Sequence, residues 1–127
     1  MLESEGMLPA IYFVFSRAGC DKSVRWMRQA GIRLTSRDEA ARIREVAETR
    51  ASWIDEADLV ALGFYEFLEG LEAGVAAHHA GMIPVFKETV EELFEAGLVK
   101  VVFATETLSL GINMPAKTVV IEDLWKF

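Results

Sequence analysis

The chain has 127 residues, of which 52% are hydrophobic and 26% charged, and it carries a net charge of −7. This length and composition are typical of one folded domain and exclude a disordered tail. No apolar run approaches the roughly 18 residues of a membrane helix, and the acidic start lacks the features of a secretory signal. The single cysteine, Cys20, excludes an internal disulfide and multi-cysteine zinc sites, and it favours a reducing, cytoplasmic compartment.

The charge is unevenly distributed along the chain. Residues 1–50 carry nine Lys or Arg against seven Asp or Glu, whereas residues 51–127 carry four against thirteen. Nucleic-acid affinity depends on neutralising phosphates, so the acidic total argues against strong binding of nucleic acid by this chain alone. It leaves open a contribution to a site shared with other domains.

Two kinds of element alternate in the first third. The apolar run AIYFVF (10–15) predicts a buried strand. The next segment predicts a helix that ends at Gly31, because Cys20, Val24 and Met27 recur at helical spacing.

A second helix is predicted to begin at Ser36-Arg37-Asp38-Glu39, which fits a capping box. Residues 51–73 are typical of irregular helix, with Gly63 and Gly70 as expected breaks.

The last third predicts a β–α–β unit. GVAAHHAGM, opened by Gly74, indicates a strand, and Pro84 stands where a helix would begin. That helix is expected to pair Lys87 with Glu91 on its surface and to end at Gly97.

LVKVVFAT (98–105) then predicts a buried strand, and residues 117–122 predict a last one. Two strands joined by a helix within about 30 residues are parallel. The expected fold class is therefore α/β, with a parallel sheet covered by helices on both faces.

Ligands of parallel sheets bind at the carboxyl ends of the strands. The predicted strands place three loops there: 16–19, 79–82, and 105–107 leading to 111–115. Their small residues and hydroxyls suit close approach to a phosphate. The same residues are ordinary turn and cap residues, so spacing alone leaves both interpretations open.

Other candidate sites are weaker. His78 and His79 should point to opposite faces of a strand, so a metal site is not expected. Cys20 falls on a packed helical face, and the cluster Asp55, Glu56 and Asp58 is expected to be a solvated helix start. No complete phosphate loop, dinucleotide fingerprint or nucleophile elbow is present in the 127 residues. A small-molecule hydrolase using Glu106 or Cys20 would have only single residues to support it.

Three segments together resemble one family. IYFVFSRAGCD resembles motif IV of superfamily 2 helicases in superkiller-like DExH-box RNA helicases. The block from GVAAHHAGM to FATETLSLGINMPAKTVV is similar to motifs IVa and V of that group. Residues 32–73 resemble the helical insertion of HelY-type members. The resemblance implies a partial second RecA-like domain, covering 1–127, of an ATP-dependent helicase or translocase.

The resemblance also implies residue roles. Ser16, Arg17, His79, Gly81, Thr105 and Glu106 would bind single-stranded nucleic acid, RNA being expected over DNA. Gly111 and Asn113 would face the nucleotide. No catalytic residue and no metal ligand is expected in this chain. ATP and Mg²⁺ would be held mainly by a first RecA-like domain outside it.

The arginine-rich motif VI of the family is also absent, so we expect a sheet truncated at its C-terminal side and no ATP hydrolysis by this chain alone. The alternative hypothesis is a stand-alone, non-catalytic α/β module that binds a protein partner or an anionic ligand.

Overall fold

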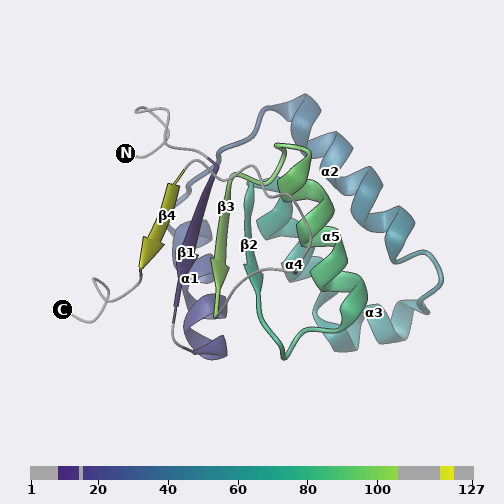
Figure 1. Ribbon diagram of the computed structural model, residues 1–127. Helices are drawn as coiled ribbons and strands as arrows, with labels where there is room; N and C mark the ends of the chain where they lie inside the picture. The colour runs from purple at the N-terminus through teal and green to yellow at the C-terminus, as the bar shows by residue number, and fades with distance from the viewer. Residues whose placement is uncertain (1–8, 15, 106–117, 122–127) are drawn as a thin grey trace.

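A computed structural model describes residues 9–14, 16–105 and 118–121, and within them the chain forms one parallel sheet (Figure 1). The strands lie in the order β2-β3-β1-β4, and every pairing is parallel. The strands are β1 (Ala10–Phe13), β2 (Val75–His78), β3 (Val101–Ala104) and β4 (Thr118–Ile121). This confirms the predicted α/β class.

Helices cover both faces of this sheet, as expected. In Figure 1, α1 lies behind the sheet, and α5 lies toward its other face. None of the helices in the described ranges is long and apolar enough to cross a bilayer. The helices are α1 (Arg17–Gln29), α2 (Arg37–Arg50), α3 (Glu56–Leu62), α4 (Phe64–Glu72) and α5 (Pro84–Glu95).

Alternation along the strands divides the interior into two cores. In β3, Val101 and Phe103 join the core under α1, whereas Val102 and Ala104 join the core under α2–α5. Successive side chains of a strand point to opposite faces, so a continuous apolar run buries both. Cys20 is fully buried in the α1 core, which confirms its structural interpretation.

Helix starts follow the predicted capping chemistry. The Ser36 hydroxyl accepts from the Glu39 N–H, and the Glu39 carboxylate accepts from the Ser36 N–H, at 3.1 and 2.9 Å. Pro84 is the first residue of α5, and Gly97 follows its end with a φ of +80°. The acidic cluster lies at the exposed start of α3, where Glu56 accepts from the Tyr65 hydroxyl.

One predicted helix break is wrong. Gly63 does separate α3 from α4 with a φ of +76°, but Gly70 lies inside α4. A methyl group at Gly70 would stand 3.1 Å from the Val75 carbonyl oxygen and 3.2 Å from Cγ1 of Val24. Gly70 therefore lets α4 approach the open edge of β2 rather than ending a helix.

Two strands are shorter than the apolar runs predicted. β1 ends at Phe13, and β3 begins only at Val101. The N–H groups of Leu98 and Val99 both donate to the Leu93 carbonyl, so these buried residues close the end of α5. The apolar run therefore predicts which residues are buried there, but it does not predict where the strand begins.

Candidate nucleic-acid interface

The carboxyl ends of β1, β2 and β3 meet at one edge of the sheet. Ala104, which ends β3, is in register with Phe13 of β1 and with His78 of β2. The residues that follow these ends are Ser16 and Arg17, His79 to Gly81, and Thr105. Five of the predicted nucleic-acid-binding residues therefore lie along one edge, from three separate parts of the chain.

The first of these segments is the start of α1. The Ser16 hydroxyl accepts a 2.9 Å hydrogen bond from the Gly19 N–H, and the first turn of α1 holds no acidic residue. A methyl group at Gly19 would lie 2.7 Å from Cγ1 of Val14, so this turn requires glycine. The partial positive charge of a helix start, with Arg17 exposed beside it, favours an anion here.

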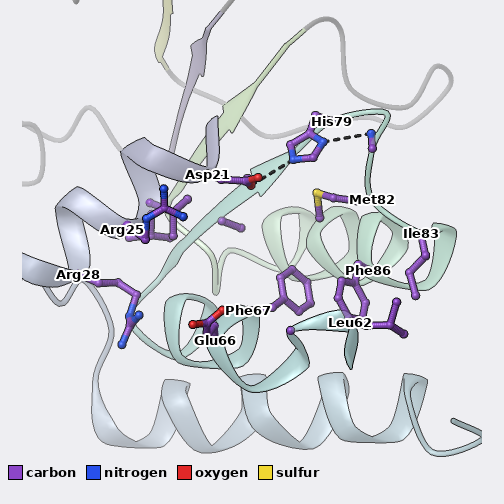
Figure 2. Close-up of a pocket in the computed structure, with 16 residues that line it drawn as sticks. Asp21, Arg25, Arg28, Leu62, Glu66, Phe67, His79, Met82, Ile83 and Phe86 are labelled. Atoms are coloured by element: carbon purple, nitrogen blue, oxygen red, sulfur yellow. Dashed lines mark hydrogen bonds and ion pairs between the residues drawn. The ribbon is translucent and has the colours of Figure 1, made fainter. Parts of the chain in front are cut away.

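The second segment is held by the buried imidazole of His79, which is 7% exposed. Its Nδ1 accepts from the Gly81 N–H at 3.1 Å, and its Nε2 lies 3.1 Å from Oδ1 of Asp21 on α1 (Figure 2). The resemblance assigns the Gly81 N–H to a phosphate, but in this structure it donates its hydrogen bond to His79.

Arg17 lies across the same loop. A methyl group at Gly81 would stand 3.3 Å from Cδ of Arg17 and 3.2 Å from the His79 ring. Among the described residues no carboxylate is within ion-pair distance of Arg17. Its guanidinium is therefore available to an anionic ligand at this edge.

Comparison with known proteins decides the family. Residues 46–126 match the family described as "Helicase conserved C-terminal domain". The chain belongs to this helicase family.

Relatives of the helicase C-terminal domain extend the match to nearly the whole chain. It is 63% identical over 126 residues to the probable helicase HelY of Mycobacterium tuberculosis (strain ATCC 25618 / H37Rv), covering 99% of this chain and 14% of the relative. It is 44% identical to the DExH-box ATP-dependent RNA helicase DExH15 chloroplastic of Arabidopsis thaliana, covering 98% and 10%. It is 34% identical to the antiviral helicase SKI2 of Saccharomyces cerevisiae, again covering 98% and 10%. The resemblance to superkiller-like and HelY-like helicases is confirmed.

A cavity of about 380 Å³ adjoins the His79 loop in this helicase domain. Figure 2 shows Phe67 and Phe86 side by side on its wall, with ring centroids 4.4 Å apart. Arg25 and Arg28 line it from α1, and Arg28 is paired with Glu69. Its walls are thus mainly apolar, with charge at the rim.

The two adjacent histidines of the helicase domain diverge, as predicted. His78 points to α5, where its Nε2 lies 2.8 Å from Oε2 of Glu91, whereas His79 points to α1. Within the described residues no three His, Cys, Asp or Glu side chains form a metal-binding group. The predicted Lys87–Glu91 surface pair is wrong, because Glu91 is only 12% exposed and bonds His78 instead.

The remaining predicted residues cannot be placed. Glu106, Gly111 and Asn113 lie outside the described residues. Asp21 was not predicted as a partner of His79, because the two residues are 58 positions apart and only the fold brings them together. The available signal was its spacing of four from Arg17, which puts both side chains on one helical face.

Proposed function

We propose that this chain serves as the second RecA-like domain of an ATP-dependent helicase or translocase that moves along single-stranded RNA. One observation carries the proposal: Ser16, Arg17, Gly81 and Thr105 gather at the carboxyl edge of a parallel sheet in a helicase C-terminal domain. The family membership favours this function over a stand-alone binding module.

The chemistry of the edge suits a nucleic-acid backbone. Arg17 offers a guanidinium to a phosphate, while the hydroxyls of Ser16 and Thr105 can each donate one hydrogen bond. Such groups hold sugar and phosphate without reading base edges, as a sequence-tolerant motor requires. Glu106, which follows Thr105, is proposed to contact the same strand through a ribose hydroxyl, because its carboxylate accepts hydrogen bonds.

ATP use belongs to the longer protein. The chain spans 14% of the HelY relative and 10% of the plant and yeast relatives, so its activity depends on regions beyond this domain. We assign Gly111 and Asn113 to the nucleotide-facing side, opposite a first RecA-like domain that would hold ATP and Mg²⁺. We assign no Mg²⁺ ligand to this chain.

The helices at 32–73 are proposed to be an insertion into the RecA-like domain. They comprise α2, α3 and α4, which pack beside β2 and α5, and the junction of α3 and α4 lines the same cavity as His79 and Gly81. The cytoplasmic location stays a prediction.

A titration of a fluorescent single-stranded RNA with the chain at low salt tests the nucleic-acid part. Arg17→Ala should weaken binding about 2- to 12-fold, the range expected for one lost hydrogen-bonding contact. Arg37→Ala is a matched control, because Arg37 is also the first residue of a helix capped by serine. Its helix starts near the opposite edge, where Thr35 lies beside Gly74. Equal effects of both substitutions would reject the proposed edge.

An ATPase assay tests whether this chain hydrolyses ATP without the proposed first RecA-like domain. The chain alone should show no turnover, since its sequence contains no phosphate loop. Turnover abolished by Thr105→Ala or Asn113→Ala would overturn the proposed function.

A further inference from the structure

The first two turns of α1 and the loop after β2 are joined by one chain of contacts. Asp21 bonds Nε2 of His79, and Nδ1 of His79 bonds the Gly81 N–H. Arg17 lies one helical turn before Asp21 on the same helix, and its side chain packs beside Gly81. Arg17, His79 and Gly81 are among the residues predicted to bind nucleic acid, and Asp21 is not.

The hydrogen bond from the Gly81 N–H determines which ring nitrogen of His79 accepts. A backbone N–H can only donate, so Nδ1 must be the bare, accepting nitrogen. The ring proton of the neutral imidazole then sits on Nε2 and is donated to the Asp21 carboxylate. Without Asp21 the other tautomer becomes accessible, and its Nδ1–H would face the Gly81 N–H, donor against donor.

We propose that Asp21 is a positioning residue for the RNA-binding edge, an inference that rests on the proposed function. Asp21 holds His79 in the Nε2–H tautomer, and His79 in turn holds the 79–82 loop in the shape that seats Arg17 over Gly81. The ring is 7% exposed, so its N–H depends on a protein partner, whereas the Asp21 side chain is 51% exposed.

A purely electrostatic role for Asp21 predicts the opposite result. A carboxylate near a phosphate site repels the ligand, so removing the charge should tighten RNA binding. Asp21→Asn removes the charge but keeps an oxygen that can accept from Nε2. Asp21→Ala removes both. Positioning therefore predicts weaker binding for Asp21→Ala and binding at least as tight as wild type for Asp21→Asn.

The first experiment needs no RNA. Long-range proton–nitrogen NMR of the chain should show the Nε2–H tautomer for His79, which is one of only two histidines and is assigned with His79→Gln. In Asp21→Ala we expect mixed tautomers and a Gly81 amide that exchanges about 2- to 12-fold faster, as for one lost hydrogen bond. Asp21→Asn should keep the tautomer. Asp38→Ala, which removes an exposed acid from α2, is the matched control.

The second experiment titrates single-stranded RNA at low salt. Asp21→Ala should bind about 2- to 12-fold more weakly than wild type, while Asp21→Asn and Asp38→Ala should not. An unchanged tautomer and amide exchange in Asp21→Ala would overturn the positioning role, as would tighter RNA binding by that variant. If the wild-type chain and Arg17→Ala bind RNA equally, the proposed binding edge fails, and the NMR results still decide whether Asp21 positions His79.

Discussion

The Nε2 atom of His78 lies 2.8 Å from Oε2 of Glu91, and the two side chains are only 10% and 12% exposed. The pair joins β2 to α5 on the face of the sheet opposite to His79. Adjacent histidines thus connect one strand end to two different helix layers. The α1 layer carries Arg17, one of the residues at which RNA is proposed to bind.

Glu91→Ala should destabilise the domain by about 1–3 kcal/mol, because it leaves a buried imidazole nitrogen without its partner. Glu91→Gln keeps an accepting oxygen and should cost less. Urea unfolding followed by circular dichroism measures both free energies of unfolding. Glu95→Ala, at an exposed position of α5, is the control and should change stability little. An unchanged midpoint in Glu91→Ala would contradict the importance of this pair.

The parallel sheet could be predicted because local signals agree with it. Apolar runs of strand length flank a helix that begins at Pro84 and ends at Gly97, and this order permits only a crossover between parallel strands. The parallel register then brings Ser16, Gly81 and Thr105 to one edge without any further assumption. Fold and site position follow from the same periodicity.

The pH dependence of stability should include a contribution from the capping box. The hydrogen bond from the Ser36 N–H, followed by that from the Lys100 ammonium, lowers the pKa of Glu39. A lowered native pKa stabilises the fold above the ordinary glutamate pKa of about 4.3, and this stabilisation is lost as pH falls through the native value.

Glu39→Gln should therefore flatten the loss of stability at acidic pH, measured by urea unfolding from neutral pH down to about pH 3. Glu45→Gln, on the exposed part of the same helix, is the matched control. Equal flattening by both would show that the capping box makes no specific contribution.

Gly70→Ala should destabilise the domain, although alanine is the better helix former by about 1 kcal/mol. The added methyl group would meet the Val75 carbonyl at 3.1 Å, and β2 is fixed by its bonds to β3. Overpacking of this kind costs about 1–3 kcal/mol, so a net loss is expected in thermal unfolding. Gly31→Ala separates backbone strain from crowding, because Gly31 has a φ of +77° and no atom within 4 Å of the added methyl group. A higher melting temperature for Gly70→Ala would show that α4 can retreat from the strand.

Features that depend on tertiary contact could not be read from the sequence. Gly70 and Gly63 both interrupt a helical pattern in the sequence. In the structure Gly70 permits close packing inside a helix, whereas Gly63 ends a helix. The partners Asp21 and His79 are 58 residues apart, and the partners of Glu91 and Lys87 on α5 depend on which helical face the sheet covers. Local spacing can show which side chains share a face but not what lies opposite it.

Gly81→Ala should weaken RNA binding while leaving stability nearly unchanged. Gly81 is exposed and is not among the glycines with positive φ, so alanine introduces no backbone strain. The methyl group would instead press on the His79 ring at 3.2 Å and on Cδ of Arg17 at 3.3 Å. Arg17 is exposed and can move aside, which removes its guanidinium from the edge. We expect a loss of about 2- to 12-fold in low-salt RNA titrations, as for one lost contact, with a melting temperature close to wild type.

Combining Gly81→Ala with Arg17→Ala should add little, because both act through the same side chain. Fully additive losses would place Gly81 in an independent contact with the RNA.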